Sequence, residues 1–119
     1  MRWRICKRSL GYRVDITEPA LLDAEEYVLF IREKNQEPDA ADRWFRGLVR
    51  AIYSLEEFPE RCPIIPEQRN FGFEIRHLIY FSHRIIFSIQ PAAERVLIYR
   101  VYHGARLPLL PEDLSHRFD

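Results

Sequence analysis

The sequence predicts an α+β domain in which an antiparallel helical hairpin packs on one face of an antiparallel sheet and leaves the other face free. Two amphipathic segments of helical period follow one another in the first half of the 119-residue chain, and three runs with strand character follow on short connections in the second half. A short strand precedes the helices, so the expected order is β-α-α-β-β-β. Hydrophobic residues make up 47% of the chain, which is enough for one domain to form a core.

The first half of the chain supplies a strand and two helices. Residues 12–17, YRVDIT, alternate and carry β-branched side chains, which indicates a strand. Thr17 is a suitable N-cap for a helix that ends near Asn35. A second helix begins at Pro38 and closes at Pro59. The apolar positions expected to face the sheet are Ala20, Leu21, Ala24, Tyr27, Val28 and Ile31 in the first helix, and Ala41, Trp44, Phe45, Leu48, Val49, Ile52 and Leu55 in the second.

The second half supplies three strands after a loop that is stiffened by proline. The loop is ERCPIIPEQRNFG, residues 60–72, and the strands are expected at 73–80, 84–89 and 95–102. Consecutive strands on short connections run antiparallel. Strict alternation of side chains predicts two faces for the last strand. One face would present Val96, Ile98, Arg100 and Tyr102, and the other Leu97, Tyr99, Val101 and His103.

The charges balance to zero over the chain, but they are segregated along it. Residues 18–43 contain eight acidic and three basic residues, whereas residues 76–106 contain five arginines and one glutamate. Residues 2–13 add five basic residues and no acidic one. This pattern predicts acidic helices and a basic sheet. The alternative is that the charges are solvated and carry no function.

The remaining composition argues for a single cytoplasmic domain. Cys6 and Cys62 have no C-x-x-C spacing and are too few for a disulfide framework. We find no signal peptide and no apolar run of membrane-spanning length, so we expect a cytoplasmic protein without membrane contact. Residues 1–11 are expected to form a basic arm, residues 12–106 the domain, and residues 107–119 a C-terminal extension.

The segment RVYHGAR, residues 100–106, places a cluster of cations at the end of the last strand. In an antiparallel pair the start of one strand lies beside the end of its neighbour. Arg84, at the start of the middle strand, is therefore expected near Tyr102 and His103, at the end of the last strand. Such a corner can bind phosphate and stack bases. It can also cleave RNA without a metal, with His103 as general acid or base and Glu67 as its counterpart. The alternative is that His103 only ends a strand and that the arginines pair with acids on the helices.

Neither a metal nor a cofactor is expected from the sequence. The histidines other than His103 lack the spacing of metal ligands. They are His77, His83 and His116. The chain also contains no P-loop, no G-x-G-x-x-G and no G-x-S-x-G motif, so the corresponding nucleotide-binding and hydrolase sites are excluded.

Four segments, taken in order and spacing, carry a resemblance to a known family. They are YRVDITEPALLDAEEYVLFI, AIYSLEEFPERCPIIPE, FEIRHLIYFSHRIIFSI and VLIYRVYHGAR. Together they resemble the RelE/ParE family of toxins from bacterial type II toxin–antitoxin modules, from about Tyr12 to Arg106. The resemblance implies a cognate antitoxin that wraps the toxin with a helix and an extended segment.

The resemblance implies different roles for the same residues in the two branches of the family. The RelE-like branch cleaves mRNA in the ribosomal A site without a metal. The positions that match its YoeB-like members are Glu67, Arg84 and His103, with Arg76 as a supporting cation. That group ends in Y-H-Y, however, whereas this chain reads Y-H-G-A-R.

The ParE-like branch poisons DNA gyrase and needs no nuclease residues. The EIRHL and VYHGAR segments resemble this branch, often labelled plasmid stabilisation proteins, and the chain has only two lysines, Lys7 and Lys34. We therefore favour a gyrase inhibitor over a ribosome-dependent endoribonuclease. A third possibility is an orphan relative that only binds an antitoxin. The residues expected to contact the antitoxin or the target are Tyr80, Arg100, Tyr102 and Arg106.

Overall fold

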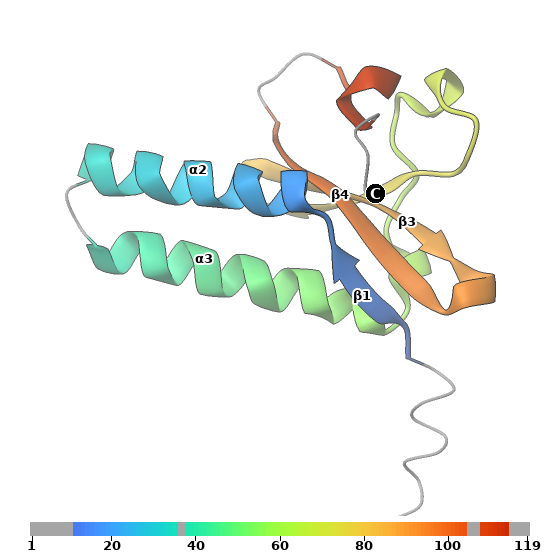
Figure 1. The fold of residues 1–119 in the computed structure, drawn as a ribbon, viewed down its shortest axis with the longest axis horizontal. Coiled ribbons are helices and arrows are strands. Elements are labelled where there is room, and N and C mark those ends of the chain that lie inside the picture. Colours follow the sequence, from blue (N-terminus) through green and yellow to red (C-terminus); the bar gives the residue numbers. More distant parts are fainter. Residues whose placement is uncertain (1–10, 36–37, 105–107, 115–119) are drawn as a thin grey trace, which may run out of the picture.

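The computed structural model describes residues 11–35, 38–104 and 108–114. The described elements follow the predicted order (Figure 1). They are β1 (Arg13–Ile16), α2 (Glu18–Asn35), α3 (Pro38–Tyr53), β2 (Arg76–Tyr80), β3 (His83–Gln90) and β4 (Arg95–His103), with short 3-10 turns in the loops. None of the helices in these residues is long and apolar enough to cross a membrane.

The sheet is mixed, so the prediction of an entirely antiparallel sheet is wrong at one strand. The strand order is β1-β4-β3-β2, and β1 pairs in parallel with β4. The other two pairings are antiparallel, as predicted. Helix α2 leads away from the end of β1, and α3 runs antiparallel to α2 and brings the chain back (Figure 1). Strand β2 therefore starts at the same end of the sheet as β1. Three alternating strands then bring β4 into the direction of β1.

Thr17 starts α2 and also ties it to the sheet. Its hydroxyl oxygen accepts the N–H of Ala20 at 3.3 Å, which confirms the predicted N-cap. The same hydroxyl donates to the carbonyl of Tyr99 at 3.0 Å, and the Thr17 N–H donates to the carbonyl of Ile98. The cap thus continues the pairing of β1 with β4 for one further residue before the chain turns into the helix.

The second helix is shorter than predicted, because α3 ends at Tyr53 and a 3-10 turn, Ser54–Glu56, follows. The guanidinium group of Arg61 reaches back over this end. It donates to the carbonyls of Ser54, Glu57 and Phe58. The carbonyls of Ser54 and Phe58 also accept backbone N–H groups, from Glu57 and Arg61. The Arg61 side chain therefore adds to the hydrogen bonds that end the helix, where a proline was expected to end it.

The main core lies between the helices and one face of the sheet. It is built from small and branched side chains of α2 and α3 against Ile85, Phe87, Val96 and Ile98. The helices contribute Ala20, Ala24, Leu48 and Ile52. Cys62 is buried at the margin of this core as a free cysteine, and burial raises the pKa of its thiol. Cys6 lies outside the described residues.

The other face of the sheet is covered, so the expectation that it is free is wrong. Ile65 of the proline-rich loop and Ile75, just before β2, lie on this face, and the C-terminal segment adds Leu109 and Leu114. They pack against Ile86, Leu97, Tyr99 and Tyr102 of the sheet. Each face of the sheet therefore has its own apolar cluster. On the face away from the helices, residues that precede β2 meet residues that follow β4.

A β-bulge in β4 overturns the predicted alternation of that strand. Ile86 pairs with Arg100 but the next residue, Phe87, pairs with Ile98, so Tyr99 is the extra residue. Before the bulge the faces are as predicted. Beyond it Val101 packs in the helix-side core, while Tyr102 joins the cluster on the other face. His103 consequently lies on the helix side of the sheet.

Candidate functional site

The predicted catalytic arginine, Arg84, is fully engaged on the face away from the helices. Its two terminal nitrogens donate to the two carboxylate oxygens of Glu67 at 3.0 and 2.9 Å. Its Nε donates to Nδ1 of His77 at 3.0 Å, and burial together with this cation lowers the pKa of that imidazole. The side chains of Arg84 and Glu67 are only 14% and 12% exposed. The pair therefore behaves as a buried structural ion pair.

Glu67 links three parts of the fold at this point. Besides Arg84, its Oε2 accepts the N–H of Leu109 from the C-terminal segment at 2.9 Å. Burial alone would raise the pKa of the Glu67 carboxyl. The hydrogen bonds from Arg84 and Leu109 outweigh burial and lower that pKa from 4.5 to about 2.

This lowered pKa predicts a loss of stability in acid. A carboxyl whose pKa is lower in the folded state stabilises the fold above its unfolded pKa and ceases to do so as the pH falls through its folded pKa. For Glu67 the window runs from pH 4.5 down to about 2, and the shift corresponds to about 3 kcal/mol. Urea unfolding at several pH values is expected to show this loss, and Glu67→Gln is expected to remove its share of the pH dependence. An unchanged slope in that variant would contradict the assignment.

The other predicted cations are also used within the fold. Arg76 donates from Nη1 to the carbonyls of Glu60 and Cys62, which pins the proline-rich loop beside β2. Arg100 forms a bidentate ion pair with Asp23 of α2, with N–O distances of 2.7 and 2.9 Å. The alternative that sheet arginines pair with acids on the helices therefore describes Arg100.

The tyrosines expected at a binding surface are partly or wholly buried. The hydroxyl of Tyr80 donates to the carbonyl of Trp44 at 2.8 Å. Tyr102 is buried at 7% exposure, and its hydroxyl lies 3.4 Å from Oδ2 of Asp113. It pairs in register with Arg84, as predicted. Arg106 lies outside the described residues.

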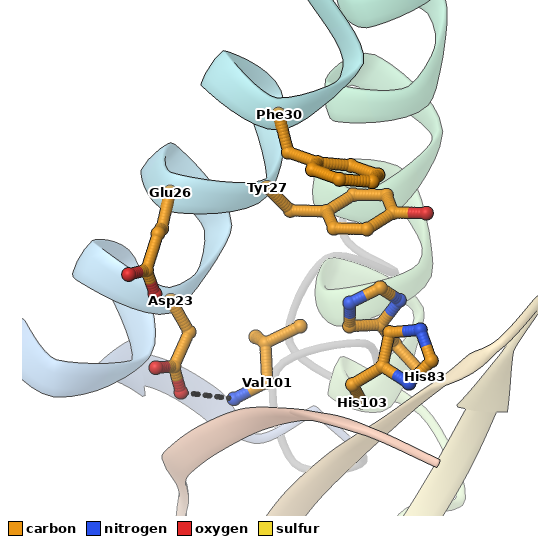
Figure 2. A pocket seen from close by; sticks show the side chains of 7 residues that line it. All are labelled: Asp23, Glu26, Tyr27, Phe30, His83, Val101 and His103. Atoms are coloured by element: carbon orange, nitrogen blue, oxygen red, sulfur yellow. Dashed lines mark hydrogen bonds between the residues drawn. The ribbon is translucent and has the colours of Figure 1, made fainter. Parts of the chain in front are cut away.

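A pocket of about 460 Å³ opens between α2 and the ends of β3 and β4 (Figure 2). It is lined by Asp23, Glu26, Tyr27, Phe30, His83, Val101 and His103. The two imidazoles lie 4.8 Å apart between ring centroids, and Tyr27 stacks with Phe30 at 5.5 Å and meets His83 edge-on at 4.4 Å. Four of the seven lining residues carry aromatic or imidazole rings, and the exposed Glu26 and the part-buried Asp23 add two carboxylates.

The sequence predicts His103 at a site but does not predict the rest of this pocket. The helical period places Tyr27 in the apolar stripe of the first helix, and His83 lacks the spacing of a metal ligand. A usable signal was present, because Tyr27 and Phe30 lie three residues apart on a helix and His83 directly precedes Arg84. His83 and His103 oppose each other in the β3–β4 register, so they reach the pocket together.

The sheet separates the three residues proposed as a nuclease set. Arg84 and Glu67 lie on the face covered by Leu109, whereas His103 faces Tyr27 of α2. Arg76 is directed to the loop carbonyls at the other end of β2. The structure therefore brings Arg84 and Glu67 together and places His103 apart from them.

The comparisons with known proteins identify the family. The model of the family described as ParE toxin of type II toxin–antitoxin system, parDE, matches residues 14–108. The chain belongs to the ParE toxin family. No curated protein matches it significantly.

Solved structures agree with the ParE-like fold. A chain of the chromosomal ParDE toxin–antitoxin system from P. aeruginosa superimposes with a TM-score of 0.64 at 14% identity, over 78% of this chain and 96% of that chain. A chain of the toxin–antitoxin complex RelBE2 from Mycobacterium tuberculosis gives a TM-score of 0.55 at 21% identity, over 82% and 95%. At these identities the likeness concerns the fold. It places this ParE-family chain in the architecture that the RelE/ParE resemblance implied.

Proposed function

We propose that this ParE-family chain is the toxin of a type II toxin–antitoxin module, that it arrests growth by poisoning DNA gyrase, and that a cognate antitoxin neutralises it. The family membership supports the module and the antitoxin. The choice of gyrase follows the ParE-like branch that the EIRHL and VYHGAR segments resemble. We assign the pocket beside His103 to the recognition of the antitoxin, so a change at His103 is not expected to remove the toxic activity.

The arrangement of Arg84, Glu67 and His103 supports gyrase over the ribosome. In metal-independent RNA cleavage a base and an acid flank the scissile phosphate while a cation stabilises its extra charge. Here the guanidinium of Arg84 is neutralised by Glu67, and His103 lies across the sheet from both. A nuclease would need this ion pair to open and one of its members to reach the other face. A binding protein needs neither change.

The experiment is induced expression of the chain in bacteria, with growth, an SOS reporter and total RNA measured together. We expect arrest with SOS induction and intact mRNA, and we expect it to persist in His103→Ala. With purified components, the chain is expected to accumulate gyrase–DNA cleavage complexes on supercoiled plasmid. Coexpression of the cognate antitoxin should restore growth.

Two results would overturn the gyrase assignment. Arrest with cleaved mRNA that disappears in His103→Ala would identify a ribosome-dependent endoribonuclease. Absence of any arrest, with a folded chain that still binds an antitoxin, would identify an orphan relative. Arg69→Ala serves as a matched surface control, because Arg69 is exposed and lies in the loop away from the pocket lining.

A further inference from the structure

Helix α3 carries three arginines on one face, and none of them forms an ion pair within the described residues. They are Arg43, Arg46 and Arg50, all exposed. The spacing of three and four residues places them along one stripe, about 10 Å from first to last at 1.5 Å per residue. Asp39 and Asp42 lie one turn before the first two but form no ion pair with them in this structure. Arg50 has no acid at any neighbouring helical position.

An aromatic ring stands beside this stripe. Phe81 is the first residue of the two-residue connection between β2 and β3, and its φ is 52°. This left-handed backbone is the position in such turns that glycine favours, and a bulky side chain there is strained. The ring is nevertheless 78% exposed, and it meets Tyr80 edge-on with centroids 4.8 Å apart. Most of the ring surface is therefore open to solvent.

The helix and the turn enclose a second pocket, of about 520 Å³. It is lined by Arg43, Gly47, Arg50, Ala51, Tyr80 and Phe81. Gly47 makes the close packing possible, because a Cβ at this position would collide with the Tyr80 hydroxyl. That hydroxyl is fixed by its bond to the Trp44 carbonyl. The Tyr80 hydroxyl is thus positioned against α3, and two arginines and one exposed ring complete the lining.

We propose that this pocket is a binding site for single-stranded nucleic acid, in which Arg43 and Arg50 hold backbone phosphates and a base stacks on Phe81. Cations that track a phosphate backbone beside an exposed aromatic ring are the elements with which proteins hold single strands. The site lies on α3 and the β2–β3 turn, apart from both Arg84 and the pocket of His103. The inference does not depend on the proposed cellular target.

The geometry favours a nucleic acid over an acidic peptide. An acidic peptide would pair with the two arginines but would leave the exposed ring of Phe81 without a stacking partner, whereas a nucleobase can stack on that ring. Stacking on such a surface is open to every base, since each has a π-face.

The test is fluorescence anisotropy of the full chain with labelled oligothymidylate and oligouridylate of about 12 nucleotides. We expect a Kd on the order of 10⁻⁵ M at low salt, with affinity falling as salt rises. Binding of either oligomer supports the site. The oligomer with the lower Kd shows whether the site prefers DNA or RNA. Arg50→Ala is expected to reduce the slope of log K against log salt by about 0.7, the value of one phosphate contact on a single strand.

Phe81→Gly separates binding from folding, because glycine relieves the left-handed backbone while removing the ring. It is expected to weaken binding between about 5-fold and 100-fold, the effect of one lost base stack. Phe58→Gly is the matched control. Phe58 is also left-handed, with φ 49°, and 74% exposed, but it does not line this pocket. Arg69→Ala is the matched control for Arg50→Ala.

Three results would overturn the proposal. One is an absence of binding to either oligomer at low salt. Another is binding that the two site variants and the two controls affect equally, which would indicate a general charge effect. The third is binding of labelled polyglutamate as tightly as the oligomers, with the same loss in Phe81→Gly and Arg50→Ala, which would make the pocket an acidic-peptide site.

Discussion

Replacing Glu67 by alanine is expected to lower the free energy of unfolding by about 3 kcal/mol, the cost of leaving one partner of a buried ion pair uncompensated. The side chain of Arg84, 14% exposed beside Glu67, would lose its carboxylate partner and keep only the hydrogen bond to His77. The N–H of Leu109 would lose its acceptor as well. Urea denaturation followed by circular dichroism measures the change at neutral pH.

A double variant provides the control for this prediction. Glu67→Leu with Arg84→Met replaces both charges by apolar side chains of similar length. Such replacements are often neutral or stabilising, so the double variant is expected to recover most of the loss. A loss below about 1 kcal/mol in Glu67→Ala would indicate that the pair is hydrated and contributes as a surface ion pair does.

This prediction bears directly on tests of toxicity. Arg84→Ala is expected to weaken the fold itself, so a loss of toxicity in that variant would not identify a catalytic arginine. His103 lies across the sheet from the Arg84–Glu67 pair and faces Tyr27 at the pocket. His103→Ala is therefore the sharper probe of mechanism, provided that its unfolding midpoint is measured alongside.

The second large effect is expected at Asp23. Asp23→Ala should cost about 2 to 3 kcal/mol, because the carboxylate accepts two bonds from Arg100 and the N–H of Val101 at 3.0 Å. The side chains of Arg100 and Asp23 are 19% and 13% exposed, so water replaces these bonds poorly. The same unfolding measurement applies.

Glu26→Ala is the matched control for Asp23→Ala. Glu26 lies three residues further along α2, lines the same pocket and is exposed. Its removal is expected to change stability by no more than about 0.5 kcal/mol. Equal effects of the two variants would mean that Asp23 contributes only to the charge of the pocket and does not hold α2 to the edge of β4.

Local patterns predicted the elements well, and the reasons are local. The N-cap at Thr17, the buried positions Ala20, Ala24, Leu48 and Ile52, and the three consecutive strands all follow from neighbouring residues. The position of β1 beside β4 depends on where the helical hairpin returns the chain. The cover on the second sheet face depends on residues about forty positions apart, Glu67 and Leu109. Neither has a signal in a short window of sequence.

The candidate site was predictable only as far as strand register allowed. The adjacency of Arg84 and Tyr102 follows from antiparallel pairing and is observed. The pairing of Arg84 with Glu67 required the path of an irregular loop, which periodicity does not describe. The face of His103 was predicted wrongly, because alternation is counted from Ile98 and the bulge at Tyr99 inserts one residue into the count.

The bulge at Tyr99 decides which face of the sheet each later residue of β4 occupies. With regular pairing throughout, His103 would point to the side of Arg84 and Glu67, and one extra residue sends it to the side of Tyr27 instead. Two chains with the same histidine and arginine in their sequences can therefore place these side chains on one face of the sheet or on opposite faces. A sequence alignment that misplaces one gap near Tyr99 would match the catalytic residues of one chain to the same residue types in the other. Those residues would nevertheless lie on different faces of the sheet.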